Sequence, residues 1–289
     1  MMFEVTKKQM REVLDSLVIP KDAIILVHSS LKAPGTTEGG AQGVIEALEK
    51  TVPEGTVVFP TLSQKNWRTV FEDWHMDRPS DVGLISETFR KQPGSLRSNN
   101  ATHSVAARGK DAEDIVSGPH DRGERYGIFG DYCFSHYSPW QKIYESRERY
   151  GRRAYVLFWG VSMMYNTYKH LVEYSYVEEL LAMIEDEEVR QACKAELAHY
   201  PVPAGQLQVT RFWPFYDSEA FFEVLEAEGI AKRVKLGNSH IICCDIFDMV
   251  NRTAKEMREN TEYMVGTNCP TAYDWILRTK ESIKTPVSK

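Results

Sequence analysis

The sequence predicts an α/β fold in which short buried strands alternate with amphipathic helices. Two observations support this prediction. Continuous apolar runs typical of core strands, such as Ala23–Val27, recur along the chain, and stretches with apolar residues at helical spacing lie between them. With 289 residues the chain can form one large domain with an ample core, and it shows no repeat, low-complexity segment or obvious linker. We therefore expect a single domain over residues 1–289.

The elements follow from local patterns, taken in chain order. Thr6–Leu17 is the first expected helix, because Thr6 and Gln9 stand at capping-box spacing before an apolar face. The expected strands are Ala23–Val27, Val57–Pro60, Tyr155–Phe158, Val209–Phe212, Arg233–Leu236 and His240–Cys244, the last two joined by turn chemistry at Gly237-Asn238. The remaining expected helices are Ala41–Lys50, Ser86–Lys91, Asp111–Val116, Thr167–Ala198 (long enough to contain a break), Ser218–Glu228 and Ile246–Glu259. Gln64–Arg78 lacks periodicity and is expected to form a surface loop or lid.

Composition narrows the function classes. The chain carries 35 Lys and Arg against 41 Asp and Glu, which argues against a general nucleic-acid binder and would suit a cationic substrate. No apolar run approaches the roughly 20 residues of a membrane helix, and residues 1–17 lack the apolar core of a signal peptide. Five cysteines without C-x-x-C spacing fit a reducing cytoplasm, which is the expected location. Cys243 and Cys244 are expected to pack in a strand rather than to form a redox pair.

Polar groups gather just beyond two of the expected strands. His28, Ser29 and Ser30 follow the first strand and Thr61 follows the second, at the position where open α/β sheets bind ligands. Gly39-Gly40 precede a helix whose N-terminus favours phosphate. These groups suit an anionic or amide-rich ligand. The alternative is a strand-to-loop cap in which the serine hydroxyls satisfy their own backbone.

His170 and Glu173 form the strongest catalytic candidate. Three residues apart on a helix, they lie on one face, and an imidazole beside a carboxylate can remove a proton near neutral pH. The alternative is a core histidine with a solvated glutamate. A metal motif fails because Tyr174 stands where a second histidine would be needed, so no metal site is predicted.

Four segments together resemble the aminoglycoside N(3)-acetyltransferase family. They are "VHSSL…GGAQGVIEAL…EGTVVFPTLS" from Val27, Pro79–Gly109, Val156–Tyr174 and, more weakly, Val234–Val250, and they occur in family order. The resemblance implies a single α/β domain with a central mixed sheet flanked by helices, and acetyl-CoA as co-substrate. The family pattern T-x-x-H-x-x-E falls on Thr167, His170 and Glu173, which implies that His170 is the general base.

The resemblance also points to the segment from Arg97 to Ala107 as a wall of the pantetheine and thioester site. It implies that Ser104 and the following amides bind the thioester carbonyl, while Arg97 either pairs with a phosphate or braces the loop. Asn100-Ala101 replace the family's His-Pro, and His103 is a separate histidine. The implied cofactor-binding residues are His28, Ser29, Ser30, Leu31, Thr61, Arg97, His103, Ser104, Val105 and Ala106.

The expected activity is transfer of an acetyl group from acetyl-CoA to an amine of an aminoglycoside-like amino sugar, at the 3-N position by resemblance. His170 would accept the amine proton within a ternary complex, and Glu173 would orient the imidazole or hold a cationic acceptor. Two alternatives stay open: acyl transfer to a non-antibiotic amine, and CoA binding without turnover. A small cationic amine is the expected partner, with neither nucleic acid nor membrane, and a homo-oligomer remains open.

Two further segments have a functional and a packing interpretation, and packing is favoured for both. The acidic stretch Glu178–Glu188 would attract a cationic acceptor, but its apolar residues stand at the spacing of a solvated helix face. The aromatic residues of Gly130–Pro139 would line an acceptor pocket or form the core of a loop.

Overall fold

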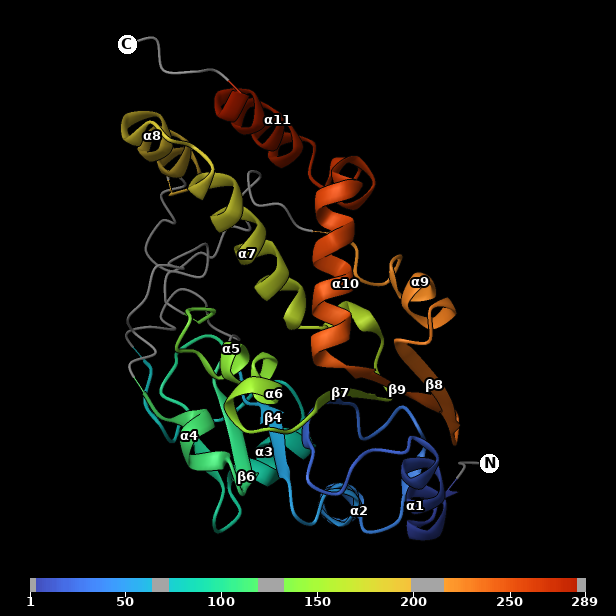
Figure 1. Ribbon diagram of the computed structural model, residues 1–289. Helices are drawn as coiled ribbons and strands as arrows, with labels where there is room; N and C mark the ends of the chain where they lie inside the picture. The colour runs from blue at the N-terminus through green and yellow to red at the C-terminus, as the bar shows by residue number, and fades with distance from the viewer. Residues whose placement is uncertain (1–3, 64–72, 119–132, 199–215, 285–289) are drawn as a thin grey trace.

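The computed structural model describes residues 4–63, 73–118, 133–198 and 216–284 (Figure 1). The strands are β1 Glu4–Val5, β2 Ile24–Ser29, β3 Thr36–Thr37, β4 Thr56–Pro60, β5 Leu96–Arg97, β6 Val105–Gly109, β7 Ala154–Trp159, β8 Ala231–Leu236 and β9 Ser239–Asp245. The helices are α1 Lys7–Ser16, α2 Gly40–Thr51, α3 Leu84–Arg90, α4 Ala112–Val116, α5 Pro139–Tyr144, α6 Ser146–Arg149, α7 Tyr168–Ala182, α8 Glu187–Ala198, α9 Phe222–Ala227, α10 Ile246–Glu259 and α11 Pro270–Lys284. A 3₁₀ turn spans Met163–Tyr165 and a π-helical turn spans Glu262–Gly266.

A seven-stranded sheet in the order β5-β6-β4-β2-β7-β9-β8 forms the centre of the molecule. The strand β2 is parallel to both of its neighbours, β4 and β7, whereas β6 and β9 run antiparallel outside them. The mixed sheet and the α/β class implied by the sequence are therefore confirmed. The three parallel strands also bring their carboxyl ends to one edge of the sheet, where ligands bind in folds of this class.

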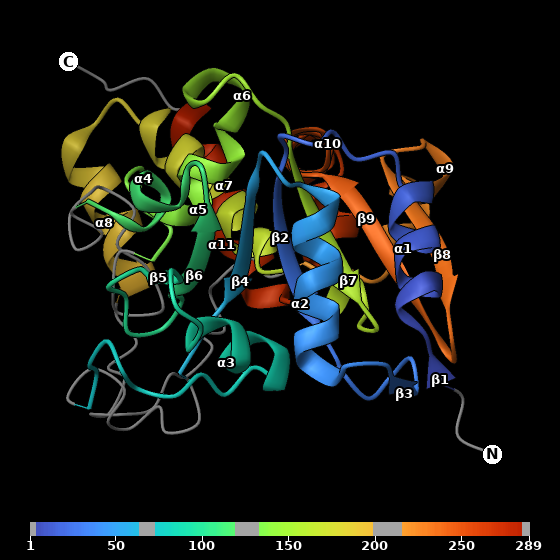
Figure 2. The ribbon, with the colours of Figure 1, turned by 90° about the horizontal axis from the view of Figure 1, so that it is seen from below.

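Helices cover both faces of this sheet, because its central strands are apolar on both sides. Ile24 and Leu26 of β2 join one buried cluster, and Ile25 and Val27 join the other. The helices α1, α2 and α3 pack on one face, and α5, α7 and α10 on the opposite face (Figures 1 and 2). Cys243 and Cys244 divide between the two clusters in the same way, so the prediction that they are packing residues is confirmed.

Most of the predicted elements are present. The capping box of α1 is complete, with Gln9 N donating to Thr6 Oγ1 over 3.2 Å and Thr6 N donating to Gln9 Oε1 over 2.9 Å. The long helix predicted after Asn166 does break, since α7 ends at Ala182 and α8 begins at Glu187. On the acidic part of α7, Glu178 contacts His136 and Glu179 contacts Arg258, while Val177 and Leu180 are buried. The favoured interpretation of this segment as a helix face is thus supported.

Other expectations differ from the structure. Ser218–Glu228 is helical only over Phe222–Ala227, and β5, β6, α5 and α11 were not anticipated. The predicted strand Val209–Phe212 and most of the predicted loop 64–78 lie outside the described residues. In the part of the chain that is described, no helix is both long and apolar enough to cross a membrane.

Candidate active site

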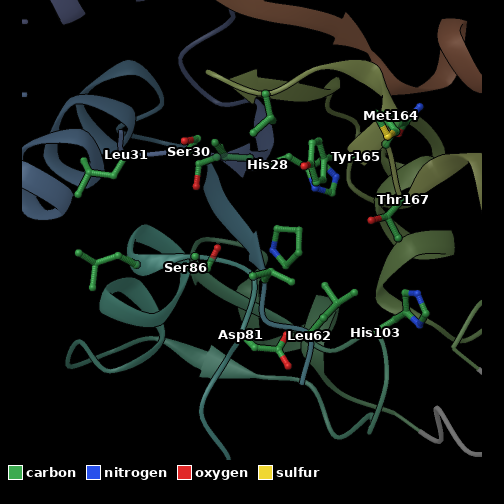
Figure 3. A pocket seen from close by; sticks show the side chains of 18 of the residues that line it. His28, Ser30, Leu31, Leu62, Asp81, Ser86, His103, Met164, Tyr165 and Thr167 are labelled. Carbon is green, nitrogen blue, oxygen red and sulfur yellow. The ribbon is translucent and has the colours of Figure 1, made fainter. Parts of the chain in front are cut away.

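A cavity of about 690 Å³ opens at the sheet edge where β2, β4 and β7 end. The end of β2 contributes His28 to Lys32, β4 contributes Pro60, and the segment between β7 and α7 contributes Val161 and the residues from Met164 to Thr167. Asp81 to Leu84 close another side in front of α3, and Figure 3 shows Asp81 and Ser86 across the hollow from Tyr165 and Thr167. The cavity therefore lies at the edge of the sheet where the polar residues after the strands predicted a ligand site.

His170 lines this cavity from the first turn of α7, and Glu173 holds it from behind. The imidazole Nδ1 lies 2.8 Å from Glu173 Oε2, while Glu173 itself is fully buried and its Oε1 accepts a hydrogen bond from Tyr216 N over 3.4 Å. The alternative of a core histidine beside a solvated glutamate does not describe this pair. Because Glu173 engages Nδ1, the tautomer it favours carries its proton there, and Nε2 is the nitrogen that can accept a proton.

The environment keeps the His170 imidazole neutral. Burial lowers the pKa of His170 well below its ordinary value of 6.5, and the ammonium of Lys169 adds a smaller effect in the same direction. A neutral imidazole is the form that a general base requires before it takes a proton. When the proton arrives, the buried carboxylate of Glu173 stands in position to stabilise the resulting cation.

Two polar atoms of residues that line the cavity have no hydrogen-bond partner in the part of the chain that the structure describes. His28 is 8% exposed and stacks on Phe158 with ring centroids 5.4 Å apart, and desolvation lowers its pKa to about 3. Within the described residues, neither His28 Nε2 nor Ser29 Oγ has a hydrogen-bond partner. Buried polar atoms are seldom left unpaired in folded proteins, so two of them at one cavity indicate a place for a polar ligand. Ser30 differs, because its Oγ accepts from Ala33 N over 3.3 Å and so caps its own loop.

Arg97 lies outside the cavity and braces the neighbouring loops. Its guanidinium donates to Thr61 O over 2.7 Å, to Met76 O over 2.8 Å and to Ser63 Oγ over 3.1 Å, and it covers the ring of Trp74. Burial lowers the pKa of this group to about 10. Of the two roles considered for Arg97, these contacts support the bracing role rather than a phosphate contact.

Several predicted cofactor residues stand behind the cavity wall. Thr61, Ser104, Val105 and Ala106 are fully buried and do not line the cavity. Ser104 Oγ donates to Thr61 O over 2.9 Å, and the amide of Val105 donates to Ser98 Oγ over 2.9 Å. These groups are thus engaged in joining β6 to its neighbours, and their contact with a thioester stays a prediction.

His103 is the member of that segment which reaches the cavity. It is 3% exposed, its Nδ1 lies 2.8 Å from Thr102 Oγ1, and its ring stands edge-on to His170 at 6.0 Å between centroids. Burial, and secondarily the neighbouring His170, lower the pKa of His103 well below 6.5. Phe134 packs against both imidazoles, which supports the packing interpretation of the loop that contains it.

The helix N-terminus at the cavity is not the one predicted. Gly39 and Gly40 do not line the cavity, and a Cβ placed at Gly39 would meet Lys7 Cε at 3.2 Å, so this end of α2 packs against α1. Gly83 and Leu84 at the start of α3 take its place. Lys32, Asp81 and Lys169 also line the cavity, although none of them was predicted as a site residue. Among the residues that the structure covers, no cluster of three or more His, Cys, Asp or Glu could hold a metal ion.

Comparison with known proteins adds sequence relatives. A family model described as "Aminoglycoside 3-N-acetyltransferase" matches residues 26–258. An aminoglycoside N(3')-acetyltransferase-like protein, YokD, of Bacillus subtilis is 32% identical over 194 residues, which are 60% of this chain and 66% of that protein. Aminoglycoside N(3)-acetyltransferase IV of a Salmonella species is 33% identical over 120 residues, 41% of this chain and 45% of the relative. The alignments thus span less than two thirds of either relative.

Solved structures with the same fold cover nearly the whole chain. The apoenzyme of aminoglycoside acetyltransferase AAC(3)-IVa superposes with a TM-score of 0.67 at 20% identity, over 96% of this chain and 99% of that one. The AAC-IIIb complex with CoASH gives a TM-score of 0.62 at 18% identity, over 89% and 98%. A mutant of AAC(3)-IVa in complex with a gentamicin gives 0.66 at 19% identity, over 95% and 98%.

Proposed function

This chain belongs to the aminoglycoside 3-N-acetyltransferase family, and we propose that it transfers an acetyl group from acetyl-CoA to an amine of an aminoglycoside-like amino sugar. One observation carries the proposal. His170, backed by the buried Glu173, lines the same cavity as His28 and Ser29, whose Nε2 and Oγ have no hydrogen-bond partner among the described residues. Transfer of an acetyl group between two bound substrates requires a general base and polar groups that bind the co-substrate, both in one cavity.

In the proposed reaction His170 Nε2 takes a proton from the acceptor amine as its nitrogen attacks the thioester carbonyl. The new C–N bond forms while the carbonyl oxygen becomes negative. The C–S bond then breaks, and the CoA thiolate leaves and takes up a proton from the imidazolium, so that His170 returns to its neutral state. Glu173 holds Nδ1 throughout and stabilises the transient cation.

The cavity suits the co-substrate in chemistry. The arm of CoA that carries the thioester contains amide groups, which pair with hydroxyl and imidazole atoms such as Ser29 Oγ and His28 Nε2. Because His28 stays neutral, it can serve as donor or acceptor without adding a charge. The CoASH complex of a protein with the same fold supports this assignment.

The test separates chemistry from binding. His170→Ala is expected to lower the turnover of acetyl-CoA and aminoglycoside by roughly a hundredfold or more, the range for loss of a general base. Glu173→Gln should also lower turnover, because the imidazolium loses its carboxylate. The exposed His240, changed to Ala, is the matched control. Calorimetry should show that all three variants bind CoA within about twofold of the parent protein.

The outcomes also distinguish the alternatives. Wild-type turnover in His170→Ala would remove the base from its assigned role. Acetyl transfer to simple polyamines but not to aminoglycosides would replace the proposed acceptor with another amine. CoA binding without transfer to any amine would replace catalysis with binding alone.

A further inference from the structure

Two lysines line the cavity and have no acidic partner in the described part of the chain. Lys32 follows β2 and Lys169 lies in the first turn of α7. Among the described residues, no carboxylate lies within 4.0 Å of either ammonium, whereas Lys7, Lys91 and Lys142 each reach one. Asp81 is the single carboxylate among the residues that line this cavity. The described wall therefore carries an excess of positive charge.

The position of Lys169 strengthens this point. It occupies the second residue of a 15-residue helix, where the helix dipole disfavours a cation, and the first turn of α7 contains no acidic residue to offset it. The dipole makes a cation in this place unfavourable, and an anion bound nearby offsets that cost. The unpaired and buried Nε2 of His28 at the same cavity is a separate sign that the wall is built for a polar ligand.

We propose that Lys32 and Lys169 form a subsite for a phosphate or carboxylate group of a bound substrate. The inference rests on the proposed function for the identity of that substrate. The anionic group belongs either to the phosphates of CoA or to an acidic substituent on the acceptor. A polycationic acceptor alone would not account for the two ammonium groups, because Lys169 would repel it beside the base.

The anion itself can be probed without any turnover. Inorganic pyrophosphate should raise the melting temperature of the parent protein, and Lys32→Gln/Lys169→Gln should abolish most of that shift. The double Lys→Arg variant should keep the shift, because it retains both charges. Lys235→Gln, on the exposed edge strand β8, is the matched control and should behave as the parent protein does.

A ligand series then identifies the source of the anion. If the phosphates of CoA are bound, the double Gln variant should bind CoA about tenfold or more weakly and bind pantetheine, which lacks phosphate, as before. If the anion lies on the acceptor, CoA binding should be unchanged and the KM should rise only for acceptors that carry an acidic group. Salt should weaken whichever interaction is affected.

The result that would overturn the subsite is also distinct. Equal pyrophosphate shifts in the parent and the double Gln variant, with CoA affinities and acceptor KM values within about twofold, would show that the lysines bind no anion. Pyrophosphate binding that depends on the lysines, in a protein that binds neither CoA nor pantetheine, would instead support the subsite and refute the proposed function.

Discussion

The three buried histidines of the site predict a steep loss of stability in mild acid. Burial holds the pKa of His28, His103 and His170 below the ordinary value of 6.5, and that of His28 reaches about 3. Below pH 6.5 the unfolded chain takes up protons at these positions, whereas the native state does not. Stability is therefore fully present above pH 6.5 and is lost progressively as the pH falls from 6.5 towards the native pKa values.

The size of the effect follows from the value for His28. With an unfolded pKa of 6.5 and a native pKa of about 3, protonation of the unfolded state alone removes about 1.4 kcal/mol by about pH 5.5. His103 and His170 act in the same direction, because burial also lowers their pKa values. The contribution of His28 alone is an appreciable part of the roughly 5–15 kcal/mol by which native proteins are stable.

Urea unfolding followed by tryptophan fluorescence between about pH 7.5 and 5.5 measures this loss, before most carboxylates titrate. His28→Gln keeps a polar side chain and removes one titrating group, so its stability should fall less than that of the parent protein, by about 1.4 kcal/mol across this pH range. The exposed His240, changed to Gln, should leave the slope unchanged. A slope in His28→Gln equal to that of the parent protein would refute the assignment of a neutral, buried His28.

Two further predictions concern the frame of the site. Arg97→Lys should lower the free energy of unfolding in urea by about 1.5–3 kcal/mol, because a single ammonium cannot replace a guanidinium that donates to several oxygens. The affinity for CoA should not change, because Arg97 lies outside the cavity. A tenfold loss of CoA affinity would instead show that Arg97 contacts a phosphate. Gly237→Ala should cost more than about 2 kcal/mol, since Gly237 has φ 56° and a Cβ there would lie 2.1 Å from Pro34 O. Gly151→Ala, with φ 66° and open space, is its control and should cost about 1 kcal/mol.

The sequence predicted the central strands well because burial on both faces leaves a clear mark. All residues of β4 and all but the last of β2 are buried or nearly so, which requires continuous apolar runs. The strand β6 escaped prediction because only its first three residues are buried, and this short run adjoins a polar segment that resembled a binding loop. The helix α11 did carry a signal: Ala272, Trp275 and Ile276 stand at helical spacing and are fully buried.

The site shows the same division between local and tertiary information. The contact between His170 and Glu173 was predictable, since it depends only on three-residue spacing in a helix. The burial of Glu173 was not, because Tyr216 reaches it from a distant part of the chain. Lys32 and Asp81 line the same cavity only because separate loops come together at the edge of the sheet. Their spacing in the sequence does not predict this.

The distribution of charge within the cavity bears on how the acceptor reacts. The whole chain has a net charge of −6, yet the described cavity wall carries Lys32 and Lys169 against Asp81 alone. Net charge therefore gives no guide to the field at the base, because nearby groups dominate at short range. Lys169 lines the same cavity as His170, so its ammonium disfavours the charged form of an amine bound there and lowers the pKa of that amine. Glu173 lies behind the imidazole and acts through it. The arrangement thus favours the neutral amine at the point of attack, and the neutral imidazole receives the remaining proton as the C–N bond forms.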